Sequence, residues 1–149
     1  MKYYSLYVII YGEVKWAMRT TSVLGRINFM KYYRIYSLEN GETRSEFLPY
    51  DLKTNDFIKG TPSFPMADMG LAKTLKVASV PSGWVGGWHP TPLKQWCVTL
   101  SGSATMETSD KNIIELTGGV AVLLDDTFGK GHHTTVVGGD DWCSMLVAV

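Results

Sequence analysis

The chain has 149 residues, of which 45% are apolar and 19% charged, and this profile is typical of a single globular domain. Fourteen basic residues balance fourteen acidic ones, so the formal net charge is zero. Because no basic cluster occurs, the sequence excludes charge-driven recognition of nucleic acid or of an anionic membrane surface. We therefore expect neither nucleic acid nor a membrane as a partner.

The first 29 residues begin with MKYYSLYVIIYGE, and we interpret them as an N-terminal strand extension. Tyr, Val and Ile favour strands, so residues 3–10 predict a strand rather than a signal peptide. The apolar run is also too short to span a bilayer. The letters MKYY recur at 30–33, which makes Met30 an alternative start. We predict an extension over 1–29 and one domain over 30–149.

From Met30 onward the sequence consists of short strand patterns separated by turns. YYRIYSL at 32–38 alternates and is followed by an Asn-Gly turn. Residues 45–72 contain three prolines and predict an irregular covering segment with at most a helical turn. Further strands are predicted at 72–80, 94–100, 103–109, 113–116, 120–124 and 141–149. Turn signals about every eight to twelve residues, without a helical apolar period, indicate an all-β fold of two sheets.

The only two cysteines, Cys97 and Cys143, form no metal-binding or redox pattern. We interpret them as buried thiols of a protein in the reducing cytoplasm. A single disulfide between them is the alternative.

One histidine lies in a distinctive frame of glycines and polar residues. Five residues separate Gly83 from His89, and one residue separates His89 from Thr91. Three residues then precede Gln95, and six more precede Gly102. These intervals resemble the first motif of the cupins, G-x5-H-x-H-x3-E-x6-G, with threonine and glutamine in place of the second histidine and the glutamate. Two glycines allow the bend before His89, so this stretch predicts a strand that presents His89 to a cavity.

The second cupin motif, G-x5-P-x-G-x2-H-x3-N, is present in looser form. Gly119 opens it, Asp125 replaces the proline, and the segment DTFGKG leads to His132. The resemblance covers roughly residue 73 to the C-terminus and is to small single-domain cupins. It implies a cupin-type jelly-roll β-barrel whose motif residues point into one cavity.

The same resemblance implies a metal site. A typical metal-binding cupin supplies three imidazoles and a carboxylate, whereas this chain offers His89, Gln95 and His132. We expect these three side chains to hold a divalent metal, such as iron, zinc, manganese or nickel, with open coordination positions. His133 is expected to face away from His132, because neighbouring strand residues point to opposite faces.

Other polar residues of the motif segments are candidates for the cavity wall. Strand alternation places Gln95, Cys97 and Thr99 on one face and Trp96 on the other. The predicted substrate pocket comprises Trp88, Thr91, Cys97 and Thr99. Asp125 is the candidate general base at the cavity mouth, and the alternative is that it forms part of a turn. Asp126 is interpreted as a turn residue.

The resemblance thus implies a cupin that acts on a small organic metabolite in its cavity, as a metal-dependent enzyme of the isomerase, lyase or oxygenase type. The alternative is a non-catalytic cupin that binds a small molecule or serves as a structural dimer. We also expect a homodimer, because an exposed strand around 32–38 or 3–10 would pair with a second subunit.

Overall fold

The computed structural model describes residues 9–10, 13–14 and 30–149, so most of the predicted strand at 3–10 lies outside the described residues. Every regular element in this part is a β-strand, as the sequence predicts. The strands are β1 (Ile9–Ile10), β2 (Glu13–Val14), β3 (Lys31–Ser37), β4 (Thr43–Pro49), β5 (Lys53–Asn55), β6 (Phe64–Met66), β7 (Thr74–Val80), β8 (Val85–His89), β9 (Gln95–Ser101), β10 (Ser103–Glu107), β11 (Ile113–Leu116), β12 (Ala121–Asp125), β13 (His132–Val137) and β14 (Trp142–Ala148). In these ranges no helix has the length and apolar character needed to cross a membrane.

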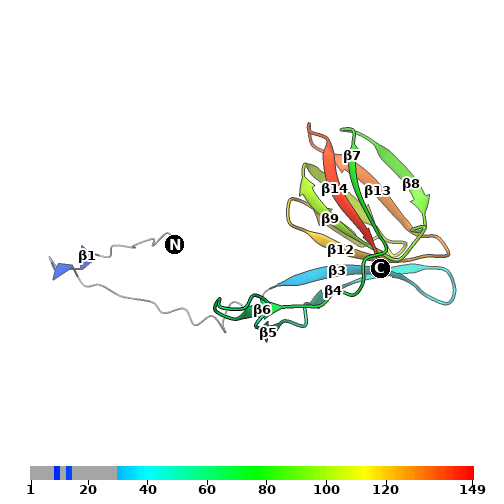
Figure 1. The fold of residues 1–149 in the computed structure, drawn as a ribbon. Coiled ribbons are helices and arrows are strands. Elements are labelled where there is room, and N and C mark those ends of the chain that lie inside the picture. Colours follow the sequence, from blue (N-terminus) through cyan, green and yellow to red (C-terminus); the bar gives the residue numbers. More distant parts are fainter. Residues whose placement is uncertain (1–8, 11–12, 15–29) are drawn as a thin grey trace.

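Two larger sheets make up the body of the fold (Figure 1). The six-stranded sheet has the order β4-β3-β12-β9-β14-β7, and the four-stranded sheet has the order β11-β10-β13-β8. Neighbouring strands are antiparallel except for β3 and β12, which pair in parallel. Both sheets are open, since each has two edge strands.

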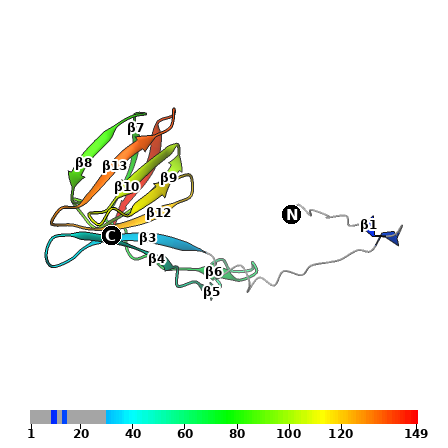
Figure 2. The same ribbon diagram turned by 180° about the vertical axis from the view of Figure 1, so that it is seen from behind.

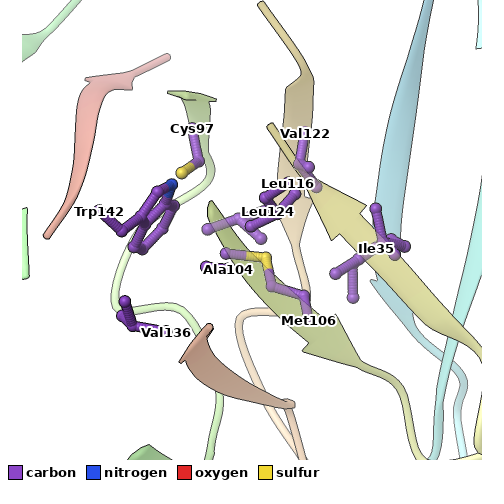
Figure 3. Packing of buried hydrophobic residues seen from close by; sticks show 10 residues of the cluster. Ile35, Cys97, Ala104, Met106, Leu116, Val122, Leu124, Val136 and Trp142 are labelled. Atoms are coloured by element: carbon purple, nitrogen blue, oxygen red, sulfur yellow. The ribbon is translucent and has the colours of Figure 1, made fainter. Parts of the chain in front are cut away.

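The hydrophobic core lies between the two sheets, because each strand turns alternate side chains toward the other sheet. Cys97, Val122 and Leu124 of the six-stranded sheet meet Met106 and Val136 of the four-stranded sheet in one buried cluster. Figure 3 shows these side chains pointing toward one another, with the Trp142 indole alongside. Alternation along 94–100 is therefore as predicted: Cys97 lies in this core and Trp96 on the outer face.

Two predictions for the N-terminal half of the domain are wrong. The segment 45–72 is expected to be irregular, but it supplies most of β4 together with the hairpin of β5 and β6. The prediction missed β4 because its charged residues and Pro49 obscure the alternation. The strand at 32–38 is not an exposed edge either, since β3 pairs with β4 on one side and with β12 on the other.

The β5–β6 hairpin extends beyond the two sheets. Both views show it on the side away from β8 and β13, beyond the ends of β3 and β4 (Figures 1 and 2). We call residues 51–66 the arm.

Candidate functional site

A cavity of about 150 Å³ lies between the sheets, and its wall includes the last residue of β8 and the first residue of β13. It opens beside Trp84, His89 and Pro92, which are at least partly exposed. None of the described residues that line it is Lys, Arg, Asp or Glu. The lining residues are Ala78, Val80, Trp84, His89, Thr91, Pro92, Gln95, Cys97, Met106, Leu124, His132, Thr134, Trp142, Ser144 and Leu146.

The structure brings His89 and His132 together at this cavity. His89 is the last residue of β8 and His132 the first of β13, and the two residues face each other in the strand register. Their ring centroids are 4.8 Å apart, with an angle of 54° between the planes. His132 is buried, whereas His89 is only partly buried at the cavity opening. The neighbour His133 packs against Trp88 on the outer face, as alternation predicts.

Both imidazoles engage their Nδ1 atoms away from the cavity. Nδ1 of His89 lies 3.0 Å from the carbonyl oxygen of Gly87, and Nδ1 of His132 lies 2.7 Å from Oδ2 of Asp126. A carbonyl and a carboxylate only accept, so each Nδ1 carries a proton. In the neutral rings Nε2 then keeps its lone pair. This arrangement is typical of metal-ligating histidines, whose outer nitrogen is oriented by a carbonyl or a carboxylate.

Asp126 is the carboxylate of the site, although the sequence analysis treated it as a turn residue. It is fully buried, and its backbone carbonyl accepts a hydrogen bond of 3.1 Å from the amide of Thr91. Oδ1 has no hydrogen-bond partner among the described residues. Asp126 therefore links the loop before β13 to the loop before β9 and fixes the ring of His132.

The structure does not bring Asp125 into the cavity. Because Leu124 points inward, the next side chain points outward, where its carboxylate accepts hydrogen bonds of 2.6 and 3.0 Å from Arg34. Lys94 lies 3.4 Å from the same oxygen. The Asp125 carboxylate raises the pKa of the Arg34 guanidinium through these hydrogen bonds. This surface ion-pair cluster joins β3 to β12 and provides no base at the cavity.

Gln95 and Thr91 lie in the cavity wall and fix each other's orientation. The Thr91 hydroxyl donates to the carbonyl of Leu93 over 2.9 Å, so its oxygen accepts from the Gln95 amide, 2.9 Å away. The amide nitrogen of Gln95 is thereby engaged, which leaves its Oε1 as the atom that can bind a ligand. Ring nitrogens of histidine and an amide oxygen are atom types that divalent metals accept as ligands, and His89, His132 and Gln95 bring both types to the wall of this cavity.

The other predicted pocket residues are divided between the cavity, the core and the surface. Cys97 lines the cavity, and Thr99 is buried behind it, where its hydroxyl accepts a hydrogen bond of 3.1 Å from the Trp142 indole. Trp88 lies outside, with the ammonium of Lys130 4.8 Å from its ring centroid. Of the four predicted pocket residues, Thr91 and Cys97 are thus placed in the wall.

Cys97 is a packing residue rather than a nucleophile. Burial raises the pKa of its thiol to about 12, and a hydrogen bond with Ser144 opposes this shift only in part. Because a thiolate is the reactive form, Cys97 stays protonated and inert near neutral pH.

We therefore expect Cys97 to resist alkylation by iodoacetamide in the native chain and to react once urea unfolds it. A cysteine introduced at the exposed position 85 serves as the positive control, read out by mass spectrometry of the two peptides. Native Cys97 that labels as fast as Val85→Cys would contradict the assignment.

Two residues that the sequence analysis did not single out hold the turn before His132. Gly131 has a φ of +73°, and a Cβ on it would lie 1.9 Å from the carbonyl oxygen of His89. Thr43 is fully buried, and its hydroxyl donates to the carbonyl of Gly131 over 2.8 Å. The Gly-Lys-Gly pattern signals the turn, whereas nothing in the sequence around Thr43 indicates its partner 88 positions away.

The acidic and histidine side chains alone do not assemble a metal centre. In the described part of the chain, no group of three His, Cys, Asp or Glu side chains has a metal-binding arrangement. A metal at this cavity therefore depends on the Gln95 oxygen beside the two imidazoles. Comparison of the chain with protein-family models and with curated protein sequences finds no significant match.

Proposed function

We propose that the chain is a cupin-type jelly-roll protein that binds a small, uncharged organic molecule at a divalent metal in this cavity. The observation that carries the proposal is a pair of imidazoles at one cavity, with ring centroids 4.8 Å apart and both Nδ1 atoms engaged, so that Nε2 of each neutral ring is the nitrogen left to bind a ligand. A carbonyl or carboxylate that accepts the Nδ1 proton orients the ring and raises the affinity of its Nε2 for a metal.

The chemistry of the cavity supports a neutral metabolite. The wall is mostly apolar and contains no lysine or arginine among the described lining residues, so a phosphate or a carboxylate finds no cation of the chain to pair with. A volume of about 150 Å³ is below the range of drug-sized ligand sites, so the ligand is small. The opening beside His89 gives solvent and ligand a route inward.

A metal held by His89, His132 and Gln95 would polarise a substrate oxygen, which suits a metal-dependent isomerase, lyase or oxygenase. The residues of the chain orient this site. Asp126 holds the Nδ1 proton of His132, Thr91 directs the Gln95 amide, and the apolar wall packs against the ligand. Iron, zinc, manganese and nickel are the candidate ions, because imidazole and amide oxygen suit each of them.

A second candidate function is binding of the small molecule without a metal. The absence of a third histidine or a carboxylate from the described cavity wall favours it, because the donor set of the chain is neutral. Elemental analysis of protein purified without chelator or affinity-tag metal separates the two candidates.

Metal binding is tested by calorimetric titration of the wild type, His89→Ala, His132→Ala and His133→Ala with zinc or iron(II). We expect His89→Ala and His132→Ala to weaken binding more than tenfold, because each removes a ligand nitrogen. His133→Ala is the matched control: it replaces the adjacent histidine on the other face and is expected to leave the affinity unchanged.

Gln95→Glu tests the oxygen donor in the opposite direction. It replaces a neutral donor by a negative one, so we expect it to bind the metal more tightly. Equal affinity of the wild type, His89→Ala and Gln95→Glu would contradict the metal site and leave the metal-free binding site as the remaining proposal.

A further inference from the structure

The outer face of the six-stranded sheet carries an apolar surface that is open to solvent. On β7, alternation turns Leu75 and Val77 outward, with exposed fractions of 65% and 71%. Val147 on β14 lies beside Leu75, and Trp96 on β9 lies beside Val147, so the surface extends across three strands and continues along β9 to the exposed Leu100. We call the outward side chains of β7, β14 and β9 the outer face. An apolar sheet face of this extent is typical of an interaction surface.

The outer face has a hollow beside Trp96 of β9. The hollow is about 230 Å³ in volume, and its wall includes Val98 and Val147 from the sheet with Tyr50 and Met69 from the chain on either side of the arm. The Trp96 indole N–H is buried there and has no acceptor among the described residues. A hollow that receives an apolar side chain, with an aromatic residue in its wall, is a common anchor point of protein interfaces.

The arm carries a second exposed apolar surface. Phe57 and Ile58 are exposed, and Phe64 packs edge-on against Phe57 with ring centroids 6.4 Å apart. The arm leaves the body on the side away from β8 and β13, and its tip lies beyond the sheets in both views (Figures 1 and 2). Its aromatic side chains therefore pack against each other rather than against the core of their own chain.

We propose that the outer face and the arm form a self-complementary interface with a second copy of this chain. In a two-fold pair each copy presents the same patch, so the face of one copy meets the face of the other while each arm reaches across. Each partner contributes about 800 Å² to a standard interface. The exposed surface of the large apolar side chains on the outer face, on the arm and on the segment between them is of comparable size. These side chains are Phe57, Ile58, Phe64, Met69, Leu71, Leu75, Val77 and Leu100.

The charges favour a second copy over a partner of opposite charge. The outward side chains of β9 and β14 are uncharged, and the whole chain has a formal net charge of zero. Two copies therefore approach without net repulsion, and a strongly acidic or basic partner finds no complementary field on this face. The strand at 32–38, which pairs on both sides within its own chain, is not the element that joins the subunits.

Sedimentation of the full-length chain at micromolar concentration tests this interface, with Val77→Lys and Val85→Lys as matched variants. Both valines lie on solvent-exposed positions of edge strands, with exposed fractions of 71% and 59%, but Val85 lies on β8 of the other sheet. We expect a dimer for the wild type and for Val85→Lys. Val77→Lys should shift the dissociation constant upward at least a hundredfold, because it places a like charge on both sides of the two-fold axis.

A wild-type monomer at these concentrations, or a Val77→Lys variant that remains as dimeric as Val85→Lys, would overturn the proposal. Circular dichroism of both variants verifies that neither lysine unfolds the sheets. If the chain is monomeric while Val77→Cys resists a thiol reagent that labels Val85→Cys, then another segment of the same chain covers the face. That outcome also overturns the second-copy interface.

Discussion

Gly131→Ala is expected to lower the free energy of unfolding by about 4 kcal/mol or more. Few single substitutions cost this much, and those that do disrupt the backbone or the core. The added Cβ would lie 1.9 Å from the carbonyl oxygen and 2.0 Å from the carbonyl carbon of His89. Both atoms belong to backbone that is paired in the sheet, so no side-chain rotation relieves the overlap. The strands that carry the two histidines must separate, and the free energy of unfolding in urea measures the cost.

Gly138→Ala is the matched control for this substitution. Gly138 has a φ of +86°, close to the +73° of Gly131, but its added Cβ meets nothing within 4 Å. Both variants share the cost of a left-handed residue, roughly 1–2 kcal/mol, and only Gly131→Ala adds the overlap. Equal losses in the two variants would mean that the close approach to His89 contributes nothing.

Asp126→Ala is expected to lower the free energy of unfolding by about 3 kcal/mol, because it leaves the Nδ1–H of a buried histidine without an acceptor. Asp126 is completely buried and His132 is exposed by only 3%. The loosened ring should also bind a metal about tenfold more weakly, since the carboxylate no longer orients it. Urea unfolding and calorimetry measure the two effects.

Asp125→Ala provides the comparison, since it removes the carboxylate one residue earlier. Asp125 pairs with Arg34 in a partly exposed cluster, and ion pairs that remain in contact with solvent contribute about 1 kcal/mol or less. We expect a small loss of stability and an unchanged metal affinity. If Asp125→Ala impaired metal binding as much as Asp126→Ala, the assignment of the buried carboxylate would be wrong.

The strands that the sequence predicts well are those with strong β-formers between turns, such as AKTLKVASV and KQWCVTL. β4 escaped prediction because its charges and proline hide the alternation. β13 begins at the histidines and is rich in threonine, and no strand bounds are predicted over 132–137 from the sequence. Which strands pair is a matter of long-range contacts, and no local pattern indicates that β3 lies beside β12.

The spacing of the first motif indicated that His89 and Gln95 share a cavity with His132, and the structure brings all three to its wall. The choice between the two aspartates could not be made from the residue types, since both lie where a strand ends. The choice depends on where the strand ends. Asp125 is the last residue of β12 and follows its alternation of faces, whereas Asp126 lies beyond the strand and contacts the His132 ring. The hydrogen bonds that orient the Gln95 amide through Thr91 likewise become visible only in the folded structure.

The parallel pairing of β3 with β12 has a consequence for the order of folding. The β3–β4 and β10–β11 hairpins join neighbouring strands and close short loops, whereas the bonds between Arg34 and Asp125 join residues 91 positions apart. Closing so long a loop costs more chain entropy than closing a hairpin, so we expect the β3–β4 hairpin to dock on β12 after the later strands have assembled. Contacts made this late are absent from the transition state, and weakening them accelerates unfolding while the folding rate stays nearly the same.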